Sequence, residues 1–229
     1  MLGILVQLTL SWLIIWLYNR KGLSVLGFGI TGKRFFYFLL LFLVTAGFCA
    51  SGFLLKMYLG HQSWQLNPAL SLKLVWDGFW WNLKSVLFEE LIFRGVLLYI
   101  LLDKIGTTKA ILVSAAAFGI YHWFSFGVLG NPLQMIIVFL MTGTMGLLLA
   151  YAFSKSRSLY LPIGIHLGWN FTQIFVFSNG PIGKGIFIPV GDASFRTDSM
   201  LLFIAVTFLP VVLMLLVDFL IVKRLKPHV

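Results

Sequence analysis

The sequence predicts an all-α fold: a polytopic transmembrane helix bundle of about seven spans, with the N-terminus outside and the C-terminus inside. Hydrophobic residues make up 60% of the chain and charged residues only 10%. Soluble domains carry roughly 25% charged residues, so this chain has too little polar surface to cover a globule in water. Long apolar segments and the placement of the basic residues between them support the same fold class. We therefore expect lipid to be the solvent for most of the protein.

Seven segments have the length and composition of membrane spans. A spanning helix needs about 20 largely apolar residues. The connecting segments are short, and no internal repeat or long linker divides the chain, which predicts one transmembrane domain over residues 1–229. The predicted spans lie near 2–18, 35–55, 76–102, 109–126, 132–153, 158–178 and 200–222.

Two stretches do not fit a simple span. Residues 71–84 mix aromatic side chains with charges, which is typical of an interfacial helix that leads into the third span. Residues 179–199 are rich in Gly and Pro and predict an irregular outer loop.

The basic residues predict the orientation. Under the seven-span model, the inner loops hold eleven Lys and Arg residues and the outer loops hold four. This asymmetry is the positive-inside pattern of a multi-pass protein, and it accounts for the net charge of +10 without a nucleic-acid partner. The eleven inner residues are Arg20, Lys21, Lys33, Arg34, Lys104, Lys109, Lys155, Arg157, Lys223, Arg224 and Lys226.

Ionisable groups concentrate in the third span, although charges are costly inside a bilayer. Glu89 and Glu90 are the only glutamates of the chain, and Arg94 follows four residues after Glu90. This spacing places Glu90 and Arg94 on one helix face within ion-pairing reach. Glu89 points about 100° away and is expected to face a cavity. The alternative is that all three form one structural charge cluster, although one Arg cannot balance two carboxylates.

Two of the four histidines lie in apolar segments. His122 follows Phe118 by four residues in the fourth span, and His166 precedes Asn170 by four residues in the sixth. His61 and His228 fall in a loop and at the C-terminal tail and are expected to be solvated. At a rise of 1.5 Å per residue, Glu89 and His122 both come about 20 Å from the inner surface and His166 about 12 Å. These side chains are therefore expected to meet near mid-membrane.

The order of these motifs resembles a known family. Glu-Glu-x-x-x-Arg (Glu89 to Arg94), Phe-x-x-x-His (Phe118 to His122) and His-x-x-x-Asn (His166 to Asn170) occur on successive apolar segments, within a motif-bearing core at about 75–180. This arrangement is similar to the CAAX protease and bacteriocin-processing family, whose eukaryotic members are the type II CAAX prenyl endopeptidases.

The resemblance implies a glutamate-dependent intramembrane endopeptidase without a cofactor. By that reading, Glu89 acts with His122 as the general base on a water molecule, and His166 and Asn170 form the oxyanion hole. Glu90 and Arg94 would support the site, and Phe118 is most simply a packing residue. The expected partners are the lipid bilayer and a peptide or protein substrate, with the protein as a multi-pass component of the cell membrane.

Three alternatives stay open at the level of the sequence. Glu89, His122 and His166 are credible zinc ligands, although the His-Glu-x-x-His helix of many metalloproteases is missing. A non-catalytic membrane scaffold, immunity factor or regulatory protein would use the same fold without hydrolysis. A proton-coupled transporter would use the Glu and His side chains as a relay, but the sequence lacks the internal symmetry that many transporters show.

Overall fold

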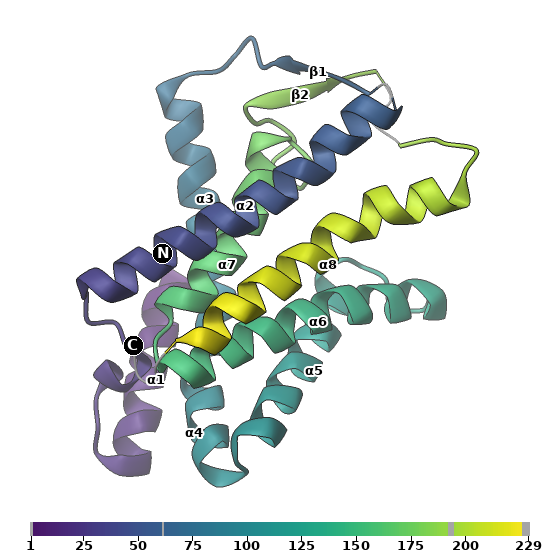
Figure 1. The fold of residues 1–229 in the computed structure, drawn as a ribbon. Helices are drawn as coiled ribbons and strands as arrows, with labels where there is room; N and C mark the ends of the chain where they lie inside the picture. Colours follow the sequence, from purple (N-terminus) through teal and green to yellow (C-terminus); the bar gives the residue numbers. More distant parts are fainter. Residues whose placement is uncertain (1, 61, 192–194, 226–229) are drawn as a thin grey trace. The chain divides into compact units, whose positions relative to one another are not determined.

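The apolar segments form helices close to their predicted positions. The computed structural model describes residues 2–60, 62–191 and 195–225. Its elements, shown in Figure 1, are α1 (Leu2–Asn19), the 3-10 turn η1 (Leu23–Leu26), α2 (Gly32–Gly60), β1 (Ser63–Leu66), α3 (Leu72–Phe93), α4 (Val96–Lys104), α5 (Thr107–Ser125), α6 (Pro132–Ser156), α7 (Tyr160–Asn170), the π-helix η2 (Phe171–Val176), β2 (Phe187–Val190) and α8 (Met200–Arg224). His61, His228 and Lys226 lie outside the described residues.

Helices dominate the described part of the chain, which agrees with the all-α prediction. Among the described residues, four helices are long and apolar enough to cross a membrane, by length and composition: α1, α2, α6 and α8. The other predicted spans correspond to α3 with α4, to α5, and to α7 with η2. Seven spans and their orientation therefore stay a prediction.

The third predicted span is not one continuous helix. The helix ends at Phe93, and α4 begins at Val96 after a break at Arg94 and Gly95. Gly95 has a ψ of -132°, far from the helical range, and a Cβ added to it would overlap the carbonyl oxygen of Leu91. The chain can turn here because glycine brings no side chain to this crowded position. The depth of about 20 Å that we expected for Glu89 assumes one straight helix over 76–102, and this assumption is wrong.

Two further expectations need correction. The sixth predicted span changes from α-helix to π-helix after Asn170. The loop predicted at 179–199 contains β2, which pairs antiparallel with β1. The register joins Trp64 to Pro189 and Gln65 to Ile188, and Figure 1 shows the two short strands side by side. The fold thus includes a small sheet that the sequence did not predict.

The described chain divides into two compact units. Unit 1 comprises residues 1–38, 87–163 and 219–229, and unit 2 comprises residues 39–86 and 164–218.

Unit 1 is organised around the helical pair α5 and α6. The turn between them ends at Asn131, whose side chain accepts a hydrogen bond of 3.2 Å from the amide of Gln134, and Pro132 occupies the first helical turn. This is a standard helix start, because Asn and Pro both suit the first positions of a helix. The two helices approach closely at Gly119, where an added Cβ would lie 2.7 Å from the ring of Phe139. Small residues permit such close packing of helices in membranes.

Unit 2 is held by an aromatic cluster and by polar ties. Phe53 of α2 stacks on Phe177 with ring centroids 4.3 Å apart, and the ring of Trp64 from β1 meets both edge-on. Offset and edge-to-face aromatic pairs add about 0.5–1.5 kcal/mol each beyond their buried area. The hydroxyl of Thr45 donates to the carboxylate of Asp218 at 2.7 Å, which joins α2 to α8.

Candidate active site

Glu89 and His122 lie together in unit 1. Glu89 is on the last turns of α3 and His122 is near the end of α5. The Nε2 atom of His122 is 3.9 Å from a carboxylate oxygen of Glu89, and the two side chains are only 10% and 14% exposed. This distance exceeds a direct hydrogen bond, which spans 2.7–3.2 Å for nitrogen and oxygen.

The tautomer of His122 follows from its other ring nitrogen. Nδ1 lies 2.8 Å from the carbonyl oxygen of Phe118, one turn earlier on α5. A carbonyl oxygen can only accept, so Nδ1 must carry the proton. In the neutral ring, Nε2 is then an acceptor that faces the carboxylate of Glu89. The site therefore presents two acceptors toward one space.

Aromatic rings enclose His122. Phe118, Tyr121 and Phe126 place their rings 4.4, 5.3 and 5.2 Å from the imidazole, centroid to centroid, and all three meet it edge to face. These contacts and the bond from Nδ1 fix the orientation of the imidazole. A low-dielectric wall on this side also strengthens electrostatic interactions in the site.

Glu90 and Arg94 form a fully buried ion pair. The guanidinium of Arg94 is 3.0 Å from Glu90, and neither side chain is exposed to solvent. This is the pair that the four-residue spacing predicts. Arg94 also donates to the carbonyl oxygen of Gly146 on α6 at 3.4 Å and lies 4.1 Å over the ring of Phe118. Arg94 thus connects the end of α3 to both α5 and α6.

Two contacts in this network have no signal in the sequence. Phe118 was expected only to pack, but its carbonyl group orients His122 and its ring supports the guanidinium of Arg94. Ser114 donates to the carbonyl oxygen of Phe93 at 2.8 Å, where α3 ends. This bond satisfies a backbone acceptor that the helix break leaves without its usual partner.

His166 and Asn170 lie together in unit 2. The amide nitrogen of Asn170 is 3.2 Å from Nε2 of His166, one turn apart on α7. An amide nitrogen can only donate, so Nε2 accepts and the proton of a neutral His166 is on Nδ1. His166 is 5% exposed, and Asn170 is half-buried. The pair therefore carries N–H donors, in contrast to the acceptors of the Glu89 and His122 pair.

The site residues thus form two chemically different pairs. The zinc alternative uses Glu89, His122 and His166 as ligands. Glu89 and His122 belong to unit 1, and His166 belongs to unit 2. The convergence of the two pairs on one cavity stays a prediction from the sequence.

Among the described residues, four helices long and apolar enough to cross a membrane indicate a membrane protein, and Glu90, Arg94, His122 and His166 are buried polar groups within it. A comparison with protein families indicates which class of protein this is. Residues 71–172 match the family model described as type II CAAX prenyl endopeptidase Rce1-like. This part of the chain is similar to the family that the motifs resemble, and by its description that family is one of peptidases. The match includes all seven predicted site residues. No curated protein and no solved structure matches the chain.

Proposed function

We propose that the protein is an intramembrane endopeptidase that hydrolyses a peptide bond in a membrane-associated protein or peptide precursor. The observation that carries this proposal is the pair of acceptors, Glu89 and His122 Nε2, at 3.9 Å. One water molecule fits between them, because its two O–H groups can donate to both. Two hydrogen bonds of about 2.8 Å across this gap meet at an angle of roughly 90°, near the angle of water itself.

The same geometry supports activation of that water. With both protons engaged, the oxygen lone pairs point away from the protein and toward a substrate carbonyl. Glu89 takes a proton as the water attacks, and His122 holds the water and shares the developing positive charge. A positioned general base of this kind typically contributes about 10²–10⁴-fold to a rate.

His166 and Asn170 suit the other half of the reaction. The attacked carbonyl oxygen becomes an oxyanion, and N–H donors in a dry site stabilise such a charge. The amide of Asn170 has a second N–H besides the one directed at His166. Removal of one oxyanion donor typically costs about 10²–10³-fold in turnover. The acceptors Glu89 and His122 therefore hold the attacking water, and the donors on His166 and Asn170 stabilise the oxyanion that forms.

Comparative proteomics tests this function without requiring a known substrate. We expect membranes with the wild-type protein to contain cleaved peptides that are absent from membranes with the Glu89→Ala variant at equal expression. The new termini identify the substrate and the cleavage site. Identical peptide sets, together with a phenotype that Glu89→Ala preserves, would instead indicate a scaffold or regulatory protein. A proton flux lost in the variant without any cleavage would indicate a transporter.

Chelation separates the glutamate mechanism from the zinc alternative. We expect EDTA or phenanthroline to change the cleavage rate by less than about twofold, because Glu89 and His122 activate water without a metal. The measurement is the initial rate on a peptide found by the proteomic comparison. Loss of activity on chelation, with recovery after addition of zinc, would assign Glu89, His122 and His166 to a metal centre.

A further inference from the structure

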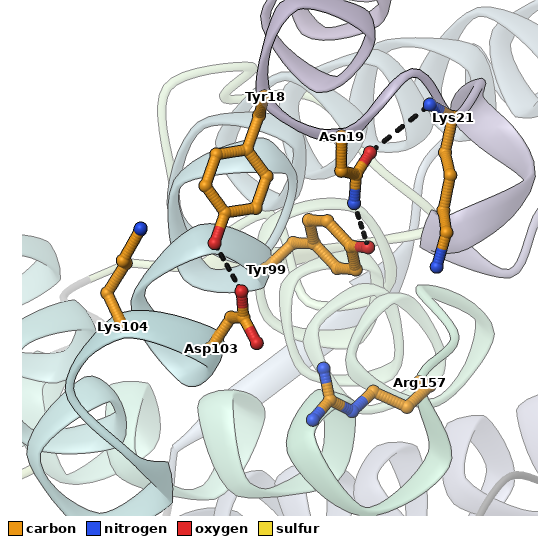
Figure 2. A pocket seen from close by; sticks show the side chains of 7 residues that line it. All are labelled: Tyr18, Asn19, Lys21, Tyr99, Asp103, Lys104 and Arg157. Atoms are coloured by element: carbon orange, nitrogen blue, oxygen red, sulfur yellow. Dashed lines mark hydrogen bonds between the residues drawn. The ribbon is translucent and has the colours of Figure 1, made fainter.

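Unit 1 contains a polar pocket apart from the Glu89 and His122 pair. Its volume is about 390 Å³, and Figure 2 shows the side chains that line it. They come from the C-terminal ends of α1, α4 and α6 and the residues that follow them. The lining residues are Tyr18, Asn19, Lys21, Tyr99, Asp103, Lys104 and Arg157.

The position of the pocket follows from the fold. The ends of the first, third and fifth predicted spans all face the inner side under the seven-span model. In the structure these three ends line one pocket, which agrees with their prediction on the same side of a membrane. Under that model, the pocket lies at the level of the inner lipid headgroups. Leu17 and Ile105, next to its lining residues, are 62% and 39% exposed and offer apolar surface for acyl chains.

Positive charge dominates the lining. Lys21, Lys104 and Arg157 are the cations and Asp103 is the anion. Asp103 accepts a hydrogen bond from the hydroxyl of Tyr18. None of the three cations forms an ion pair with a residue that the structure describes. Each helix C-terminus contributes about half a negative charge at most, so basic residues here offset the helix dipoles and leave an excess.

A chain of hydrogen bonds prepares a further donor. The backbone amide of Lys21 donates to the side-chain oxygen of Asn19 at 3.2 Å, which fixes the orientation of that amide group. The nitrogen of Asn19 then donates to the hydroxyl oxygen of Tyr99 at 2.8 Å. The hydroxyl of Tyr99 accepts this bond and keeps its own O–H as a donor for a ligand in the pocket that it lines. In Figure 2, Asp103 and Tyr18 lie to the left of the pocket, Asn19 and Lys21 to the right, and Arg157 below.

The backbone holds Arg157 in place. Its φ of 51° is a left-handed conformation that non-glycine residues rarely adopt. Gly27, which directly follows η1, packs against this position, since a Cβ on Gly27 would overlap the carbonyl oxygen of Arg157. The hydroxyl of Ser158 donates to the carbonyl oxygen of Gly27 at 3.1 Å. The pocket thus has a cation on a fixed backbone as well as the flexible Lys21 and Lys104.

We propose that this pocket binds the phosphate of an anionic phospholipid headgroup from the inner leaflet. Arg157 and Lys21 pair with the phosphate oxygens, and the hydroxyl of Tyr99 donates a hydrogen bond to them. Charge-assisted bonds from Arg and Lys are the usual means of phosphate recognition. Basic pockets between membrane helices on the inner side are suited to such headgroups. This site is independent of the proposed peptidase chemistry.

Lipid retention measures this binding directly. We would reconstitute the full chain in nanodiscs of phosphatidylcholine that contain increasing fractions of phosphatidylglycerol, then count the lipids that stay bound by native mass spectrometry. Wild type should retain phosphatidylglycerol in preference to phosphatidylcholine. Lys21→Gln and Arg157→Gln should each weaken this preference about fivefold, as the loss of one basic contact near a membrane surface predicts. Tyr99→Phe keeps the ring and should weaken it by a smaller factor.

Lys109→Gln is the matched control. It removes the same charge from an exposed position on the same predicted side, outside the pocket. The proposal requires Lys109→Gln to retain phosphatidylglycerol like wild type. If Lys109→Gln weakens the preference for phosphatidylglycerol as much as the pocket variants do, the effect comes from general surface charge and the proposed binding site is wrong.

A second experiment adds inorganic phosphate to lipid-free protein in detergent. If phosphate alone raises the unfolding temperature as much as phosphatidylglycerol does, the ligand is a free phosphate and the lipid assignment is wrong.

Discussion

Replacing Glu89 by Gln is expected to abolish peptide-bond hydrolysis and to leave the protein folded. Glutamine has nearly the same shape but cannot take a proton from water, so only the general base is lost. The expected decrease in turnover is about 10²–10⁴-fold, the usual contribution of a positioned base. The measurement is the initial cleavage rate of a peptide substrate, together with the thermal unfolding midpoint in detergent, which should match wild type.

The neighbouring carboxylate supplies the comparison for this experiment. Glu90 undergoes the same chemical change in Glu90→Gln, but it faces Arg94 and not His122. The assignment of Glu89 as base requires the first variant to lose activity and keep its stability. If Glu89→Gln unfolds the protein while Glu90→Gln has no effect on either quantity, Glu89 is a structural residue and its assignment as the base is wrong.

The second large effect concerns the buried ion pair. Glu90→Gln is expected to destabilise the protein by about 3–5 kcal/mol, because removal of one partner leaves the other as an uncompensated buried charge. Arg94 would then keep uncharged contacts with the carbonyl oxygen of Gly146 and the rings of Phe118 and Phe93. The measurement is the free energy of unfolding in mixed micelles.

A double-mutant cycle separates the pair from other effects of the substitutions. Glu90→Gln combined with Arg94→Gln leaves no buried charge at this position, so the double variant should be less destabilised than the sum of the single variants. Residues in direct contact typically show coupling energies of about 0.5–3 kcal/mol. Strict additivity would mean that the two side chains do not stabilise each other, contrary to their 3.0 Å contact.

The sequence predicts local features of this protein well, for physical reasons. Apolar length determines where helices can lie in lipid, and every predicted span overlaps a helix of the structure. A spacing of four residues places Glu90 beside Arg94 and Asn170 beside His166, since both pairs use the helical repeat.

Features that depend on distant parts of the chain could not be predicted. At the helix break before Gly95, the carbonyl oxygen of Phe93 accepts a hydrogen bond from Ser114, 21 residues further along the chain, and the sequence does not reveal such a partner. Arg94 donates a hydrogen bond to the backbone carbonyl oxygen of Gly146. Every residue has such an oxygen, so the sequence cannot show which one accepts the bond. The strand β2 lacks the alternation of polar and apolar residues that is typical of a strand, and it contains Pro189, although proline is rare in sheets. In these cases tertiary packing decides the local structure.

The sheet between β1 and β2 has a consequence for the biogenesis of the protein. Synthesis proceeds from the N-terminus at roughly 5–20 residues per second, so β1 leaves the ribosome long before its partner. The pairs of this sheet, from Ser63 with Val190 to Leu66 with Phe187, cannot form until residue 190 has been made. Glu89, His122 and His166 all belong to the intervening segment and are synthesised while this large loop is open. Unit 2 is therefore completed late, after α5 and α6 of unit 1 already exist and can pair with each other during insertion.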